Sequence, residues 1–132
     1  MPFVERIILI DDNESDNAYH KIMIDRAGFK GDIVVLEDSV EALRYLEEAD
    51  LDKPTCIFLD INMPMMDGFE VAERVTPWLA SKPVAILMML TSSSSEADRR
   101  RAREIPVIRG FITKPLTVEA VQDPIAKAIV ST

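Results

Sequence analysis

The chain has little of several features that define common classes of protein. It contains a single cysteine, Cys56, so no internal disulfide can form, and its place in an apolar run indicates a small buried side chain in a reducing compartment. No run approaches the roughly 20 apolar residues that a membrane span requires. The N-terminus lacks a basic segment followed by a long apolar stretch. We therefore expect a cytoplasmic protein without membrane insertion.

Positive charge is also scarce. The chain has 15 Lys and Arg residues against 23 Asp and Glu residues, which gives a net charge of -8. Because basic patches supply most of the affinity of proteins for DNA and RNA, this balance argues against direct binding of nucleic acid. A Gly-x-x-x-x-Gly-Lys-Ser/Thr segment is absent as well, which excludes a P-loop nucleotide site.

Apolar residues, by contrast, are plentiful. They make up 48% of the 132 residues, enough for the core of one domain, which we expect to span residues 1–132. Short runs rich in Ile, Val and Leu alternate with helix-like segments, and such runs are typical of strands buried on both faces. The expected strands are Arg6–Ile10, Ile33–Leu36, Thr55–Leu59, Val84–Leu90 and Val107–Phe111.

This alternation predicts an α/β fold with helices on both faces of a parallel sheet. The specific prediction is a doubly wound (βα)5 flavodoxin-like sandwich of five strands in the order 2-1-3-4-5. The first expected helix presents a face of Tyr19, Ile22, Met23 and Ala27, and it ends at Gly28.

Three details of the helices carry expectations of their own. His20, the one histidine, is interpreted as a surface or boundary residue of the first helix. The second helix is expected to follow an N-cap at Ser39. The third, which contains Phe69, is expected to end near Pro77 and to leave Trp78 in the following loop.

The last two expected helices are less regular. The fourth, Ser94–Glu104, has a thin apolar face of Ala97, Ala102 and Ile105, so we expect it to be the most mobile helix. The fifth, Val118–Ile129, contains Pro124. Because proline inside a helix costs about 3 kcal/mol or more, that helix starts late, bends or is divided.

Polar residues follow four of the five expected strands. Asp11 and Asp12 follow the first, Asp60 the third, Thr91 the fourth and Lys114 the fifth. Each residue alone is as well explained by helix capping or by a solvated loop. The carboxyl ends of parallel strands line one edge of a sheet, however, so these side chains are expected to converge. Three carboxylates, a hydroxyl and an ammonium together suit a hard divalent cation and a phosphoryl group.

The acidic pair after the first strand also distinguishes two kinds of site. A flavin or nucleotide site would place Gly, Ser or Thr there, to hold phosphate on backbone amides. Asp11 and Asp12 repel bare phosphate and repel each other unless a cation lies between them. Phosphate would therefore arrive only with a metal or on a carboxylate.

In this order the residues resemble the receiver domain of two-component response regulators. The resemblance covers nearly the whole chain and rests on four segments: Asp11-Asp12, residues 59–68 (LDINMPMMDG), Thr91-Ser92 and residues 111–115 (FITKP). It implies that Asp60 is the phosphoacceptor and that the cofactor is Mg²⁺. The implied direct ligands of the metal are Asp12, Asp60 and the backbone carbonyl of Asn62, and Asp11 would act largely through a metal-bound water. Lys114 would pair with a carboxylate or phosphoryl oxygen, and Thr91 would bond the phosphoryl group.

The resemblance also implies partners and a switch. The phosphoryl group would come from the phosphohistidine of a sensor histidine kinase, or pass to or from a histidine phosphotransfer protein. Thr91 would then move toward it and Phe111 would turn inward, although many family members have tyrosine at the Phe111 position. The surface of the fourth helix, fifth strand and fifth helix would change and bind a downstream protein target. Because the chain ends soon after the fifth helix, we expect a stand-alone receiver or a piece of a longer protein.

Several alternatives remain open. A receiver catalyses only its own phosphoryl transfer and dephosphorylation, whereas a metal-dependent phosphohydrolase would use Asp60 as a nucleophile and would need a substrate-binding cap. A scaffold that has lost phosphorylation is a third possibility, and the intact set of acids with Thr91 and Lys114 argues against it. The basic run Arg99, Arg100, Arg101 and Arg103 is either a solvated face balanced by neighbouring acids or a docking patch for an acidic partner.

Overall fold

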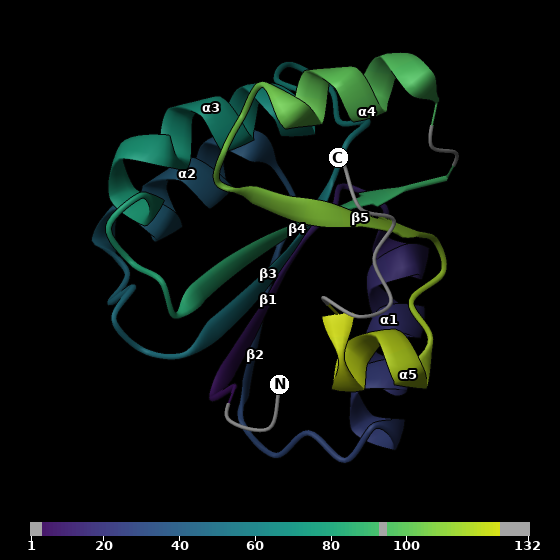
Figure 1. The fold of residues 1–132 in the computed structure, drawn as a ribbon. Coiled ribbons are helices and arrows are strands. Elements are labelled where there is room, and N and C mark those ends of the chain that lie inside the picture. Colours follow the sequence, from purple (N-terminus) through teal and green to yellow (C-terminus); the bar gives the residue numbers. More distant parts are fainter. Residues whose placement is uncertain (1–3, 93–94, 125–132) are drawn as a thin grey trace.

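Five parallel strands form the central layer of the structure, and helices cover both of its faces (Figure 1). The computed structural model describes residues 4–92 and 95–124. Within them the elements are β1 (Arg6–Ile10), α1 (Glu14–Arg26), β2 (Asp32–Leu36), α2 (Ser39–Glu48), β3 (Thr55–Asp60), α3 (Gly68–Leu79), β4 (Ala85–Thr91), α4 (Glu96–Arg103), β5 (Ile108–Thr113) and α5 (Val118–Gln122). The strand order is β2-β1-β3-β4-β5, which confirms the predicted fold class.

The strands are apolar on both faces because both faces are buried. In β1, Ile8 and Ile10 pack into one core while Ile7 and Leu9 pack into the other. Helices α2, α3 and α4 cover the first face, and α1 and α5 cover the second (Figure 1). Burial of this apolar surface on both sides of the sheet is the main source of stability.

Three strands end later than the sequence predicts, β3 and β4 by one residue and β5 by two. Asp60 is the last residue of β3 and pairs in register with Leu90, and Thr91 is the last residue of β4 and pairs with Thr113. A polar side chain is tolerated there because the ladder needs only the backbone groups, and the side chain projects at the edge of the sheet.

The predicted buried face of α1 is wrong in part. Tyr19 and Ile22 are 45% and 51% exposed, whereas Asn17 and His20 are buried at 4% and 1%. The interpretation of His20 as a surface or boundary residue is therefore also wrong. The buried face of α1 includes polar residues because the N-terminal half of the helix lies against the polar edge of the sheet. The positions of the apolar residues alone therefore do not identify this face. Gly28, with φ of 87°, follows the end of the helix as predicted.

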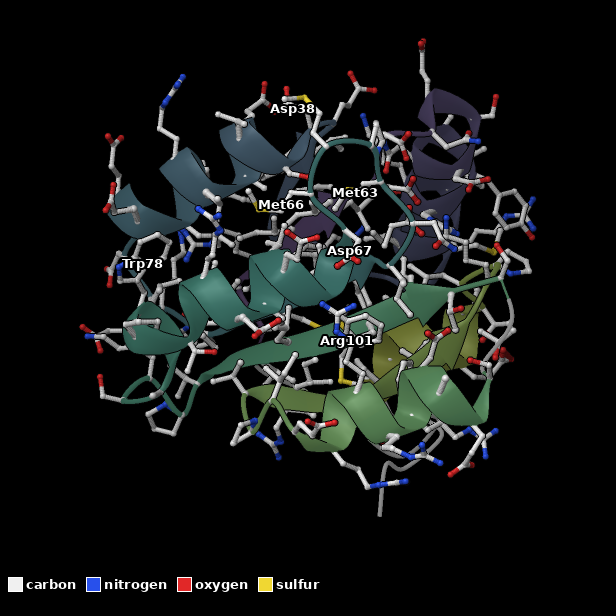
Figure 2. The ribbon with its side chains drawn as sticks, turned by 90° about the horizontal axis from the view of Figure 1, so that it is seen from above. Asp38, Met63, Met66, Asp67, Trp78 and Arg101 are labelled. Carbon is white, nitrogen blue, oxygen red and sulfur yellow. The ribbon has the colours of Figure 1, made fainter. Side chains whose placement is uncertain are left out.

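The N-cap of α2 is Asp38 rather than Ser39. The Asp38 carboxylate accepts a hydrogen bond from the backbone N–H of Glu41 at 2.7 Å, and Asp38 has the extended backbone of a cap. Ser39 is the first helical residue, and its hydroxyl donates to the carbonyl of Met66 at 2.6 Å. Asp38 and Met66 lie at the same end of α2 in Figure 2.

Helix α3 continues through Pro77 to Leu79, close to the end predicted near Pro77, and the predicted placement of Trp78 in the following loop is wrong. Proline so near the C-terminus removes one backbone donor from the last turn only. The hydroxyl of Thr76 donates to the carbonyl of Ala72 at 2.8 Å and adds a bond in that turn. Trp78 consequently lies in the helix, at its far end in Figure 2, and packs half-buried against the core.

The two remaining helices are short. Ser95 caps α4, and of the predicted apolar face only Ala102 and Ile105 are buried, while Ala97 is exposed. Helix α5 ends before Pro124, as expected from the steric restriction that proline places on the preceding residue. Its predicted continuation to Ile129 lies outside the described residues.

Among residues 4–92 and 95–124, no helix combines the length and the apolar character that crossing a membrane would demand.

The cap of α2 leads to a stability prediction. Asp38→Ala removes the acceptor for the Glu41 N–H and should lower the free energy of unfolding by about 1 kcal/mol. Asp38→Asn keeps an acceptor in the same place and should remain near wild type. Urea denaturation followed by Trp78 fluorescence measures both, and equal losses in the two variants would contradict the assignment of the cap.

Candidate functional site: an ammonium among carboxylates

Lys114 lies at the centre of the polar edge of the sheet. It follows β5 directly, and its backbone N–H donates to the carbonyl of Thr91 at 2.8 Å, while the peptide bond to Pro115 is cis. Its Nζ atom lies 2.8 Å from Asp11 Oδ2, 2.9 Å from Asp16 Oδ2 and 3.0 Å from Asp60 Oδ1. The ammonium therefore forms an ion pair with each of these three carboxylates.

Asp11 is held in place from several sides. It is 1% exposed, and its Oδ1 atom accepts from the backbone N–H of Asn13 at 2.9 Å. Its carbonyl accepts from the side-chain amide of the buried Asn17 at 2.9 Å. A buried carboxylate needs such partners, since an unpaired one would be strongly destabilising.

The acidic cluster has the chemistry of a cation site. Asp11, Asp12 and Asp60 each offer a carboxylate oxygen, and these atoms lie within 4.8 Å of one another. Asp11 and Asp60 are buried, while Asp12 is exposed. An all-oxygen set that is partly open to solvent is suited to Mg²⁺, which binds a few carboxylates and retains several waters.

Burial raises the pKa of Asp60 to about 6, and the neighbouring charge of Asp11 adds to that shift. The hydrogen bond and charge of Lys114 act in the opposite direction but do not cancel it. A divalent cation between the carboxylates would favour the ionised form and lower this pKa again.

The pKa values of Lys114 and His20 are shifted by burial and by the charges around them. Burial alone would lower the pKa of Lys114, but its hydrogen bonds to Asp11, Asp16 and Asp60 raise that pKa well above its ordinary value. Burial, together with the charge of Lys114, lowers the pKa of His20, so this imidazole is neutral at pH 7. Lys114 is therefore the permanent positive charge of the site.

A close approach of backbones shapes the loop that follows β3. The backbone N–H of Gly68 donates to the carbonyl of Ile61 at 2.7 Å, and a Cβ at position 68 would collide with the carbonyl oxygen of Asp60. Glycine is the residue that permits this approach. The loop exposes the side chain of Asn62, the predicted carbonyl ligand, and includes Met65 with a φ of 69°.

Thr91 and Phe111, the two predicted switch residues, occupy the neighbouring strands. Thr91 is 2% exposed at the end of β4, one register step beyond Asp60. The Phe111 ring is fully buried, and its role in a switch stays a prediction.

Helix α4 contacts the loop beside the site through Arg101. Its guanidinium lies 3.4 Å from Asp67 Oδ2 and 3.5 Å from Glu73 Oε1, and it lies 4.9 Å from the centre of the Phe69 ring. Figure 2 shows Arg101 between the two helices, directed at Asp67. Arg103 pairs with Glu96 within α4. Part of the basic run is thus paired internally, and its role as a docking patch stays a prediction.

The structure brings together the predicted Asp11, Asp12, Asp60 and Lys114, with Thr91 on the adjoining strand. Sequence reasoning missed Asp16 and Asn17. Asp12 precedes the N-cap Asn13, so no helical spacing connects Asp16 to the acidic pair, and Asp16 reads from the sequence as an ordinary acid of the first helical turn.

Comparison with known proteins agrees with this geometry. The sequence model of the response regulator receiver domain matches residues 7–126. The chain is 34% identical over 123 residues to the probable methanogenesis regulatory protein FilR2 of Methanothrix harundinacea, covering 89% of this chain and 76% of that protein. It is 29% identical to the alkaline phosphatase synthesis transcriptional regulatory protein PhoP of Bacillus subtilis, covering 86% of this chain and 43% of PhoP.

A solved structure has the same fold. The receiver domain of sensor histidine kinase PA1611 from Pseudomonas aeruginosa, with a magnesium ion coordinated in its active-site cleft, superposes with a TM-score of 0.74. It covers 95% of this chain and 97% of that domain at 19% identity.

The fold and the acidic edge define a phosphoryl-signalling domain of the two-component class. This chain belongs to the response regulator receiver domain family. Its acidic pocket fits the phosphoacceptor and Mg²⁺ site of that family.

The raised pKa of Asp60 predicts a pH dependence of stability without metal. Between the ordinary value of 3.8 and about 6, folded Asp60 binds more protons than unfolded Asp60, so its contribution to the free energy of unfolding falls as pH rises. Asp60→Asn lacks this loss. Between pH 4 and pH 6.5, the free energy of unfolding of Asp60→Asn should therefore rise by about 2 kcal/mol relative to that of wild type. Urea denaturation in EDTA at several pH values measures the difference, and a constant difference would contradict the prediction.

Proposed function

We propose that this receiver accepts a phosphoryl group on Asp60 from a phosphohistidine in a reaction that requires Mg²⁺. The observation that supports this most directly is the position of Lys114, whose ammonium lies 3.0 Å from Asp60 and 2.8 Å from Asp11. A cation held there can neutralise negative charge on a transferring phosphoryl group without rearranging during the reaction.

The metal would be held by the acidic cluster. Asp12 and Asp60 would bind it directly with the backbone carbonyl of Asn62, and Asp11 would act largely through a metal-bound water. The oxygen-only donor set fits Mg²⁺, and the magnesium found in the PA1611 receiver domain supports the choice. When bound, the ion supplies positive charge that offsets the charge on the phosphoryl oxygens.

The transfer exchanges one bond to phosphorus for another. A carboxylate oxygen of Asp60 forms the new P–O bond while the P–N bond of the phosphohistidine breaks, and the departing imidazole keeps the electron pair and takes a proton from solvent. Lys114 donates an N–H to the oxygens that carry the developing charge, and Thr91 would donate its hydroxyl to the bound phosphoryl group. Hydrolysis of the acyl phosphate returns Asp60 to a carboxylate.

The proposed output is a change in the surface formed by α4, β5 and α5. Thr91 moves toward the phosphoryl group, and Phe111 alternates between its buried position and an outward one. A downstream protein target reads that surface, and the kinase or a histidine phosphotransfer protein is the partner at the acidic edge. The proposal includes a cytoplasmic location, no membrane insertion and no direct contact with nucleic acid. The family match favours this function over a phosphohydrolase.

The site assignment is tested by intact-mass measurement after incubation with acetyl phosphate and Mg²⁺. Wild type should gain one phosphoryl group, Asp60→Asn should gain none, and EDTA should abolish the gain. Asp25→Asn, an exposed acid of α1, is the matched control and should be labelled like wild type.

Labelling of Asp60→Asn would refute the assignment of Asp60. If wild type gains nothing and also fails to bind beryllofluoride with Mg²⁺, a receiver that serves as a scaffold becomes the better description.

A further inference from the structure

Asp16 contacts the reactive centre although it belongs to neither the acidic cluster nor any strand end. Its Oδ2 atom lies 2.9 Å from Lys114 Nζ, and its side chain is 38% exposed, against 1% for Asp11 and 13% for Lys114. It lies in the first turn of α1, so it approaches the ammonium from the solvent side.

The contact closes a ring of interactions. Asp11 Oδ1 accepts from the backbone N–H of Asn13 at 2.9 Å, and Asn13 Oδ1 accepts from the backbone N–H of Asp16 at 2.9 Å. Asp16 accepts from Lys114 at 2.9 Å, and Lys114 returns to Asp11 at 2.8 Å. The start of α1 and the end of β5 are thereby joined through one ammonium.

Lys114 needs such an anchor because of its own chemistry. A lysine side chain is a compact charge on a flexible four-carbon stem that carries about 2 kcal/mol of rotamer entropy. The backbone of Lys114 is fixed by its bond to Thr91, but that bond leaves the stem free to rotate. When a metal or a phosphoryl group binds, Asp11 and Asp60 would interact with it as well as with Lys114. Asp16 lies outside the cluster that would hold the metal, so its contact with Lys114 would be unchanged.

We propose that Asp16 is a positioning residue for phosphoryl transfer, which holds the Lys114 ammonium with one N–H directed at Asp60 and the incoming phosphoryl oxygen. The inference rests on the proposed function of Asp60. Asp16 touches Lys114 and not the reacting atoms, so it acts through the lysine.

Asp16 also has an opposing effect, because its negative charge offsets part of the charge of Lys114. The Asp16 side chain is 38% exposed, and ion pairs in contact with water contribute little. Misplacing a catalytic group by about 1 Å, by contrast, can cost about 100-fold in rate. Position should therefore outweigh charge, and removing the carboxylate should slow the reaction.

The test compares Asp16→Asn with Glu14→Gln, which removes the same charge from the same turn of α1. Initial rates of phosphoryl incorporation from acetyl phosphate are measured by intact mass at saturating Mg²⁺, and Mg²⁺ affinity is measured by titration. We expect Asp16→Asn to be about tenfold slower than wild type, Glu14→Gln to stay within about twofold, and the two variants to bind Mg²⁺ alike.

A second readout follows the lysine itself. In ¹⁵N-correlated NMR spectra, the ammonium protons of Lys114 should be observable in wild type and in Glu14→Gln, because each is held on a carboxylate. They should be lost to solvent exchange in Asp16→Asn. Asp16→Glu retains a carboxylate that can reach Lys114, so it should recover a rate between those of Asp16→Asn and wild type.

Each outcome decides a different question. A rate for Asp16→Asn at or above that of wild type would overturn the positioning role while the function of Asp60 stands. An Asp16→Glu rate no higher than that of Asp16→Asn would also overturn the positioning role. In that case the slow rate of Asp16→Asn would be explained by a disturbed fold instead. Absence of labelling in wild type, together with absence of beryllofluoride binding, would overturn the proposed function itself.

Discussion

The site depends on one ammonium placed among carboxylates that would otherwise repel one another. Asp11 and Asp60 are almost completely buried, and buried like charges are unfavourable unless a cation pairs with them. Lys114 provides that charge at all times. The remaining excess of negative charge is still felt, since the pKa of Asp60 stays raised to about 6. The same excess of negative charge favours binding of a divalent cation, so the raised pKa of Asp60 and the proposed metal binding have one physical cause.

The fold delivers this arrangement through its strand order. Strands β1 and β3 are neighbours in register, with Ile10 opposite Leu59, so the residues that follow them emerge side by side. Strand β5 lies beyond β4, and a long side chain is needed to cross that distance, which a lysine supplies. The two apolar cores beneath the sheet edge exclude water from Asp11 and Asp60 and strengthen every charge interaction there.

The loop after β3 connects the site to the rest of the molecule. Gly68 brings α3 against the carbonyl of Asp60, and Asp67 caps α3 while it pairs with Arg101 of α4. On the other side of the site, Asp16 connects α1 to the end of β5 through Lys114. Helix α1 therefore contacts a charge of the site directly, whereas α4 contacts the loop that follows Asp60.

The apolar runs predicted the five strands, because strands buried on both faces contain few polar residues. The residues after those runs predicted Asp11, Asp12, Asp60 and Lys114, because the carboxyl ends of parallel strands share one edge. The sequence also indicated the break before Pro124, which follows from local sterics. The pairing of Asp16 with Lys114, the burial of His20 and the bond of Ser39 to Met66 depended on tertiary structure. Those features are decided by which side chain a neighbouring element brings within bonding distance, and residue type along the chain does not encode that distance.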